Sequence, residues 1–308
     1  MTYRTVAKSD VAYSVITEQI LAALDKNEVP WRKPWNLPAG QRPHNAITKH
    51  SYTGINAIML AFSGRTDPRW LTLRQVLARG GRVTRSEFRK ATQIVFWKSF
   101  SREVEDKNTG ETKTSRWGMY RYYRIYNVEQ CEGLKLPAIE AENVGDFDPI
   151  AAADAIIKNM PKRPAITHDG NDGAYYVPAK DAVHMPKQEH FDSSGEYYST
   201  LFHELAHSTG HASRLDRHGM ETGIAPFGSE TYSREELAAE FANAFVSAAA
   251  GIEHTLENSA AYIAGWAKAI RKDIKLVVMA ASQGQKAADY ILAGPEAGVD
   301  KPHRVMRP

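Results

Sequence analysis

The chain of 308 residues contains a single cysteine, Cys131. One thiol cannot form an intramolecular disulfide or a cysteine-rich zinc cluster, so Cys131 is expected to pack as a small hydrophobe in a reducing compartment. No stretch approaches the ~20 consecutive apolar residues of a membrane span. The apolar run at residues 274–281 is short and contains Lys275. Because the first residues also lack the apolar run of a signal peptide, we expect a cytoplasmic protein with no membrane partner.

The sequence also lacks internal repeats, a phosphate-binding loop and a GxGxxG motif. These absences argue against repeat architectures and dinucleotide-binding folds. With 43% hydrophobic and 24% charged residues, the chain is expected to be folded over most of its length. It is long enough for two ordinary domains.

The net charge of +3 conceals an uneven distribution. Residues 1–140 contain 23 Lys and Arg against 13 Asp and Glu, a net +10, whereas residues 141–308 contain 16 against 23, a net −7. Such an asymmetry indicates two domains with different partners. The segment between them turns acidic, lacks periodicity and is punctuated by glycine and proline. We therefore predict an α+β protein with a small basic α/β domain over residues 1–135, a linker over 136–148 and a second domain over 149–308.

The most specific pattern in the second half is His203-Glu-Leu-Ala-His207. Positions i and i+4 lie on one face of an α-helix, so both imidazoles can bind one ion. Glu204 lies beside that face, where its carboxylate can deprotonate a water molecule. This is the H-E-x-x-H arrangement of zinc metallopeptidases, in which zinc is the Lewis acid and the glutamate is the general base. The alternative is a surface helix that carries two histidines by chance.

The flanking sequence places this motif on a buried helix. Ser193 followed by Glu196 forms a capping box, which marks a helix start. Apolar residues then recur at helical spacing, namely Tyr198, Leu201, Phe202 and Leu205. Gly210 follows the second histidine, and glycine just after a periodic run is a typical helix stop. A motif in the last turns of a helix with one apolar side favours the metal site over chance.

A catalytic zinc site needs three protein ligands and one open position. His211 is the first candidate for the third ligand, but it lies beyond the expected helix stop. The metzincin pattern has its third histidine three residues after the glycine, where this sequence has Ser213, and this departure argues against a metzincin. Glu236 and Glu240 are better candidates, one helical turn apart on a later helix. Glu240 falls within the apolar stripe of that helix, where a carboxylate is costly without a metal or a hydrogen-bond donor.

This arrangement resembles the gluzincin group, in which a glutamate on a later helix is the third ligand and an acid four residues on orients a zinc histidine. The resemblance implies that Glu236 is the ligand and that Glu240 accepts an imidazole N–H. In the alternative, Glu236 only caps its helix, through a capping box with Ser233, and Glu240 binds the metal. The expected ion is Zn²⁺, with another divalent ion such as Mn²⁺ as the alternative.

The rest of the second half is expected to pack around the motif helix. Periodicity and turn signals predict a helix over residues 150–160, a hairpin over 165–178, a strand over 181–186 and a long helix over 258–279. The strand over 181–186 is expected beside the motif helix, where it is a candidate to pair with an extended peptide. Candidates for stabilising an oxyanion are Tyr232, His211 and Arg214.

The basic half combines helical periodicity with runs of β-formers. We expect helices over residues 11–24 and 72–79, strands over 93–98 and 119–126, and a polar loop over 103–115. In Trp31-Arg-Lys-Pro-Trp35, two tryptophans flank two cations in an extended segment. Aromatics interleaved with Arg and Lys suit single-stranded nucleic acid, because bases stack on the rings and the cations neutralise the backbone. The alternative is that many of these aromatics are core residues.

Several motifs also carry a family resemblance. In the first half they are Pro30-Trp-Arg-Lys-Pro-Trp35, Asn45-x-x-Thr-Lys-His-Ser-Tyr52-x-Gly-Ile-Asn56, Trp70-x-Thr72-x-x-Gln75 and Tyr126-Asn-Val-Glu-Gln130. They resemble the N-terminal domain of ArdC-type antirestriction proteins. In the second half, the histidine motif, Gly210, Arg214-Leu215 and Glu235-Glu-Leu-Ala-Ala-Glu240 resemble the zincin-like metallopeptidase domain that follows in that family. The likeness covers residues 9–255.

The resemblance implies a plasmid or mobile-element protein that binds single-stranded DNA and shields incoming DNA from host restriction. Its implied protein substrate is a component of a restriction system. In the alternative function, the protein protects DNA by binding alone, and its metal site is structural or active only under certain conditions. The expected DNA contacts are Trp31, Arg32, Lys33, Trp35, Asn56, Trp70, Arg74, Lys98, Arg121 and Arg124.

Overall fold

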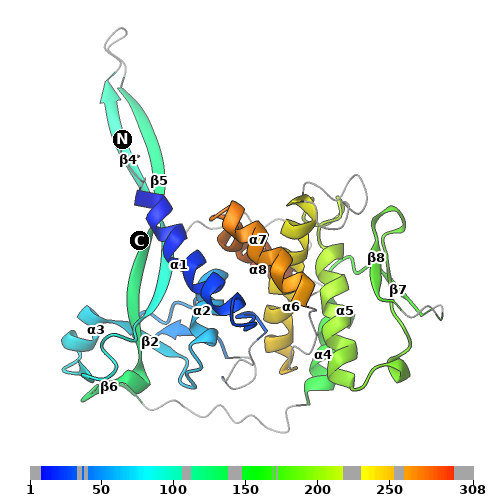
Figure 1. Cartoon of the computed structure of the whole chain (residues 1–308), viewed down its shortest axis with the longest axis horizontal. Coiled ribbons are helices and arrows are strands. Elements are labelled where there is room, and N and C mark those ends of the chain that lie inside the picture. The colour runs from blue at the N-terminus through cyan, green and yellow to red at the C-terminus, as the bar shows by residue number, and fades with distance from the viewer. Residues whose placement is uncertain are drawn as a thin grey trace.

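The computed structural model describes residues 8–32, 37, 41–105, 112–137, 148–168, 170, 173–217, 230–252 and 260–294. Figure 1 shows a sheet-containing first half beside a mainly helical second half. Within the described residues, no helix is both long enough and apolar enough to cross a membrane.

The first half is a mixed sheet with helices packed against it. Its helices are α1 (Lys8–Leu24), α2 (Ile55–Phe62) and α3 (Leu73–Ala78). Its four-stranded sheet has the order β1-β2-β5-β4, formed by β1 (His44–Asn45), β2 (Arg69–Thr72), β5 (Thr112–Asn127) and β4 (Thr92–Glu105). A smaller sheet pairs β3 (Arg82–Val83) with β6 (Cys131–Glu132), which follows the 3-10 turn Val128–Gln130.

Two of these helices confirm the sequence-based expectations, and one was missed. Helices α1 and α3 lie where periodicity predicted them, and α3 begins at a capping box between Thr72 and Gln75. The missed helix is α2, whose residues are apolar almost throughout and buried from Ile55 to Ala61. A short helix that is buried on all sides has no polar face, so periodicity cannot reveal it.

The hairpin of β4 and β5 is longer than expected. The two strands pair from Thr92 opposite Ile125 to Glu105 opposite Thr112, and the hairpin projects away from the helices in Figure 1. The prediction of a loop over residues 103–115 is therefore wrong at both of its ends, and its centre, 106–111, lies outside the described residues. Backbone hydrogen bonds hold a two-stranded ribbon together, so its sequence need not alternate between apolar and polar residues.

The described residues of the second half form five helices beside a small three-stranded sheet. Its helices are α4 (Pro149–Asn159), α5 (Ser194–Ser208), α6 (Glu230–Ala250), α7 (Ala260–Lys272) and α8 (Leu276–Ile291). Its strands are β7 (Ala165–Thr167), β8 (Tyr175–Val177) and β9 (Ala182–His184), with 3-10 turns at Pro178–Lys180 and Gln188–His190. The predicted helices at α4 and α5 are confirmed.

Three expectations for this half are wrong. The sheet order is β7-β9-β8, so β7 and β8 do not form a hairpin with each other. Strand β9 contacts α5 as expected, but it is paired on both sides and offers no free edge to a peptide.

The long helix expected over 258–279 is divided into α7 and α8. At the break, the Asp273 carboxylate accepts the backbone N–H of Lys275 at 3.0 Å, a local bond that competes with helix continuation.

The two halves share one continuous hydrophobic core. It contains Ile16 and Ile20 of α1, Ile58 of α2, and buried residues of α4 to α8. Two hydrogen bonds also join the halves: Thr17 Oγ1 donates to the Ile274 carbonyl at 2.7 Å, and the backbone N–H of Gly54 donates to a Gln285 side chain at 3.0 Å. Helix α1 lies along α7 and α8 in Figure 1. The domain boundaries predicted from composition remain a prediction, and residues 138–147 lie outside the described part of the chain.

The close approach of α6 and α8 generates a prediction for Gly284. A Cβ atom at this position would lie 2.6 Å from Phe241 Cβ and 2.8 Å from the Ala238 carbonyl oxygen. Gly284→Ala should therefore lower the free energy of unfolding by about 1–3 kcal/mol, the usual cost of overpacking. Gly265→Ala is the matched control, because a Cβ at this exposed position of α7 meets nothing within 4 Å. It should stabilise the protein by about 0.5–1 kcal/mol. Urea unfolding followed by circular dichroism measures both; equal effects would contradict the packing argument.

Candidate metal centre and nucleic-acid surface

Helix α5 brings His203 and His207 to one face. The helix starts where the Ser193 hydroxyl accepts the backbone N–H of Glu196 at 3.1 Å, and it ends at Thr209. The apolar residues predicted for its buried side are buried, Leu201, Phe202 and Leu205 among them. With that side fixed in the core, the two imidazoles lie one turn apart, and their Nε2 atoms are 3.1 Å from each other.

Helix α6 contributes Glu236 to the same point. Its Oε2 lies 3.6 Å from His203 Nε2, and its Oε1 lies 3.5 Å from His207 Nε2. Helix α6 begins at Glu230, so Ser233 lies inside the helix and does not cap it. The reading in which Glu236 serves only as a capping residue therefore has no support in this geometry. Buried polar contacts also join α5 and α6, including one from Asn243 Nδ2 to Ser199 Oγ at 3.3 Å.

The three side chains fit a divalent ion. Ligand atoms about 2.0–2.1 Å from a tetrahedral ion lie about 3.3 Å apart. The separations of 3.1, 3.5 and 3.6 Å between the two Nε2 atoms and the Glu236 oxygens are all close to this value. Two imidazoles and one carboxylate also form the donor set of a catalytic zinc site with an open position. Among the described residues, these three form the one group of His, Cys, Asp and Glu side chains close enough to hold an ion.

The electrostatics of the centre favour a cation. Burial would lower the pKa of His203, but the carboxylates of Glu236, Glu204 and Glu240 together raise it to about 9. Burial would also lower the pKa of His207, but the carboxylates of Glu236 and Glu235 outweigh this effect, so the pKa of His207 is raised as well. Glu204 is itself buried on α5, and its effect on both histidines indicates that its charge acts on the centre. Negative charge around two imidazoles stabilises an ion held between them.

A second carboxylate, which sequence reasoning missed, supports His207 from behind. Glu235 Oε1 lies 3.4 Å from His207 Nδ1, and Arg217 holds the same carboxylate at 2.6 Å. The guanidinium of Arg217 also donates to the Ala206 carbonyl at 2.9 Å. Burial raises the pKa of Glu235, but His207 and Arg217 lower it more, so the carboxylate stays ionised. Glu235 could have been suspected from its place beside Glu236; nothing in the sequence pointed to Arg217.

Glu240 lies behind His203, and Arg32 of the first half donates hydrogen bonds to this carboxylate. Glu240 Oε1 is 3.9 Å from His203 Nδ1, and Arg32 Nη2 donates to Glu240 Oε1 at 3.2 Å. The expectation that Arg32 contacts DNA is therefore corrected, because its guanidinium is engaged with a buried carboxylate. Glu240 lies behind His203 Nδ1 and is not one of the three converging groups.

Two of the candidates for an oxyanion stabiliser, Arg214 and His211, are engaged in other contacts. Arg214 is buried, and its guanidinium bonds to Asp181 and to the Ser208 carbonyl, so it has a structural role. His211 is engaged with Ser213, its Nδ1 lying 2.8 Å from the hydroxyl oxygen. The side chain of Tyr232 lies outside the described part of the structure.

The structure corrects three further expected DNA contacts. Trp31 and Trp70 are 0% and 1% exposed, so neither ring can stack on a base. Asn56 is buried, and its amide exchanges hydrogen bonds with the backbone of Val95 at 2.7 and 2.8 Å. Lys33 and Trp35 lie outside the described residues. The other four expected contacts are exposed: Arg74, Lys98, Arg121 and Arg124.

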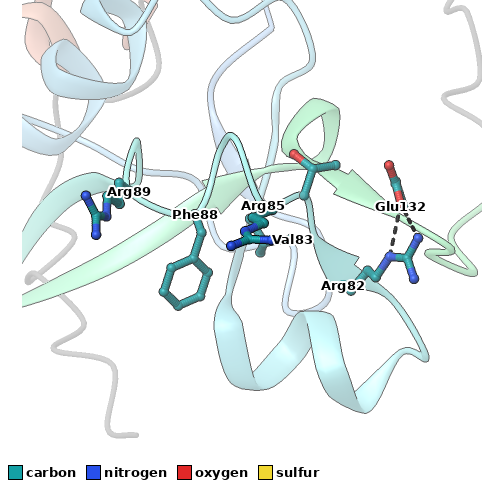
Figure 2. Close-up of a pocket in the computed structure, with 7 residues that line it drawn as sticks. Arg82, Val83, Arg85, Phe88, Arg89 and Glu132 are labelled. Carbon is teal, nitrogen blue, oxygen red and sulfur yellow. Dashed lines mark hydrogen bonds and ion pairs between the residues drawn. The ribbon is translucent and has the colours of Figure 1, made fainter.

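A basic hollow that sequence reasoning missed lies near one of these cations, Arg124, which donates to the carbonyl of Phe88 in its lining. It has a volume of about 790 Å³, and we call it the Phe88 hollow; its lining residues are Arg82, Val83, Thr84, Arg85, Phe88, Arg89 and Glu132. Figure 2 shows the Phe88 ring between Arg85 and Arg89 in this view, with Arg82 paired to Glu132 farther off. Phe88 is 44% exposed. An exposed ring flanked by guanidinium groups matches the chemistry of a stacked nucleotide.

The loop that carries Phe88 is held by bonds on its inner side. Glu87 accepts hydrogen bonds from Lys90, Gln130 and Arg65, which lower the pKa of its carboxyl group to about 2. The carbonyl of Phe88 accepts a bond from Arg124 Nη2 at 3.2 Å and one from the Tyr126 hydroxyl at 3.1 Å. These anchors leave the loop's acid facing inward and its arginines facing the hollow. The same contacts place Arg124 of β5, an expected DNA contact, next to the Phe88 hollow.

Comparisons with known proteins fit this division of the chain. A family model for the N-terminal domain of the anti-restriction factor ArdC matches residues 10–128, and one for a zincin-like metallopeptidase matches residues 151–283. The metal-free crystal structure of the antirestriction ArdC protein from plasmid R388 is 33% identical, with a TM-score of 0.69 over 91% of this chain and 96% of that one. The chain belongs to the ArdC family of antirestriction proteins. The predicted α+β fold, with a basic first domain and a zincin-like second domain, is thereby confirmed.

Other members and relatives extend the comparison. The Mn(II)-bound structure of the same R388 protein is 32% identical, with a TM-score of 0.68 over 91% of this chain and 96% of that chain. A protein named DNA primase TraC from Escherichia coli is 37% identical over 295 residues, which are 91% of this chain but 20% of that protein. The chain thus spans about a fifth of the length of this relative.

The centre generates a prediction about metal binding. Adding Zn²⁺ or Mn²⁺ to the metal-stripped protein should raise its unfolding temperature, because an ion at a hundred times its Kd stabilises the folded state by about 2.7 kcal/mol. His207→Ala should abolish this effect, since it removes one of three ligands. His211→Ala is the matched control, because His211 lies four residues on and outside the cluster. Differential scanning fluorimetry measures both; loss of the effect in His211→Ala alone would contradict the assignment.

Proposed function

We propose that this protein is a single-stranded DNA-binding metallopeptidase that protects DNA from restriction. The observation that carries the proposal is the convergence of His203, His207 and Glu236 within 4.8 Å of one another. These residues would hold Zn²⁺, with Mn²⁺ as the alternative that the R388 relative suggests. The expected protein substrate is a component of a restriction system, because DNA binding in the first half would bring the centre close to proteins acting on that DNA.

The chain's own residues supply the proton chemistry. A divalent ion, when bound, supplies Lewis acidity toward a peptide carbonyl. Glu204 follows the first ligand directly and is buried, where its carboxylate can take a proton from the attacking water. It then returns this proton to the leaving amine, so that its own charge is restored at the end of the cycle. Glu235 and Glu240 face the outer nitrogens of the two histidines, at 3.4 Å from His207 Nδ1 and 3.9 Å from His203 Nδ1, where negative charge favours the orientation that directs each Nε2 atom to the ion.

Glu204→Gln tests this role. The variant should keep its metal content, because Glu204 is not one of the three converging groups, but its hydrolysis of a fluorogenic casein should fall by about 10²–10⁴-fold.

 The control is Glu189→Gln, which changes an exposed carboxylate that pairs with Lys187 and lies outside the metal centre. It should hydrolyse casein at the wild-type rate. If Glu204→Gln lost its metal instead, Glu204 would be structural.

A second function is favoured by a separate observation. The Phe88 hollow presents an exposed ring and arginines in the first half, away from the histidines. A protein that protects DNA by binding alone would need this surface and no hydrolysis. A restriction-protection assay in cells separates the two functions. Protection that is lost in Glu204→Gln supports the peptidase, and protection that persists supports binding alone.

DNA binding has its own prediction, at Phe88. We expect Phe88→Ala to weaken binding of a fluorescent oligo(dT) by about tenfold, because stacking on an aromatic ring contributes about 1–3 kcal/mol per base. Met279→Ala is the matched control, since it removes an exposed apolar side chain from the second half. Fluorescence anisotropy at low salt measures both affinities. Equal affinities of Phe88→Ala and the wild type would exclude the Phe88 hollow, and no binding by the wild type would exclude single-stranded DNA as the partner.

A further inference from the structure

The segment Trp31-Arg32 belongs to the basic half by sequence but packs into the second half. The Trp31 ring is 0% exposed, and its centroid lies 4.8 Å from that of Phe241 and 5.3 Å from that of Trp266. Phe241 follows Glu240 directly on α6. The tryptophan therefore fixes the segment against the helix that carries the acids of the metal centre, and it brings the next residue, Arg32, to Glu240.

The contact between Arg32 and Glu240 is a two-point contact in a buried place. Arg32 Nη2 donates to Glu240 Oε1 at 3.2 Å, and Arg32 Nε donates to Glu240 Oε2 at 3.4 Å. The two side chains are 12% and 4% exposed. A guanidinium that holds both oxygens of a carboxylate fixes its orientation as well as its charge. Glu240 is therefore held with its Oε1 oxygen in a defined place.

That oxygen faces the outer nitrogen of His203. Glu240 Oε1 is 3.9 Å from His203 Nδ1, which is buried and has no hydrogen-bond partner within the described residues. A histidine that binds an ion through Nε2 carries its proton on Nδ1, and a carboxylate at Nδ1 favours this tautomer. The contacts thus form a series from Arg32 through Glu240 to His203.

We propose that Arg32 is a positioning residue of the metal centre, supplied by the basic half of the chain. It holds Glu240 so that the carboxylate orients His203 toward the ion. The inference rests on the proposed metal centre and adds that the centre is complete only when the Trp31-Arg32 segment is docked on α6. It also gives the paired motif of tryptophan and arginine a role inside the protein.

Metal affinity of the full-length chain tests the proposal without any use of activity. Outer partners of metal ligands typically contribute 10–100-fold to affinity. Arg32→Met and Arg32→Lys should therefore weaken Zn²⁺ binding by about tenfold or more in calorimetric titrations, the lysine variant because it lacks the two-point fork. The visible spectrum of bound Co²⁺ should change in both. Arg271→Met is the matched control, because Arg271 also joins the halves, through an exposed ion pair with Asp25 at 2.5 Å. It should bind Zn²⁺ as the wild type does.

A double-mutant cycle tests the route through Glu240. If Arg32 acts through this carboxylate, Arg32→Met should cost little further affinity in a Glu240→Gln background. Additive losses would overturn the route, and wild-type affinity with an unchanged Co²⁺ spectrum in both Arg32 variants would overturn the proposal. An equal loss in Arg271→Met would also overturn it, since general loosening between the halves would then suffice. If Arg32→Met does not fold by circular dichroism, Arg32→Lys decides. A wild-type chain that binds no Zn²⁺ would instead refute the proposed metal centre itself.

Discussion

The packing of α6 is the constraint on which the rest of the structure depends. This helix is buried along most of its length and contacts α4, α5, α7 and α8, and Trp31 packs on it as well. Three of its acids, Glu235, Glu236 and Glu240, are costly in such surroundings unless each has a partner. Each of the three carboxylates lies within 4 Å of an imidazole or a guanidinium nitrogen: Glu235 of His207, Glu236 of His203 and Glu240 of Arg32. The same packing that forms the core therefore creates the concentration of charge at the centre.

The two halves are joined by contacts that a charge count does not reveal. The first half has a large positive excess, yet one of its arginines, Arg32, is directed into the second half. The shared core and the ring contacts of Trp31 also form part of this connection. The first half thus contains the Phe88 hollow and also supplies Arg32 to the surroundings of the candidate metal centre.

Sequence patterns predicted those parts of the protein that depend on local structure. The caps and apolar spacing of α5 located the motif helix, and the spacing of His203 and His207 placed both on one face. Patterns failed where the outcome depends on distant partners. Strand β9 lies between β7 and β8, which no local signal reveals, and Trp31 is buried by rings more than 200 residues away in the chain. An aromatic beside a cation looks the same in sequence whether it faces a base or a core.

The sequence by itself determined the side chains available to the candidate metal centre: two histidines one turn apart, a glutamate beside them, and acids on a later helix. These follow from residue type and helical period alone. Only the tertiary structure decided which acid meets both histidines and which stand behind them. Glu236 and Glu240 are one turn apart on α6, so the crossing of α6 over α5 directs one to the Nε2 atoms and the other to His203 Nδ1. It also decided that Arg32 is an internal partner, because docking of the whole first half sets that contact.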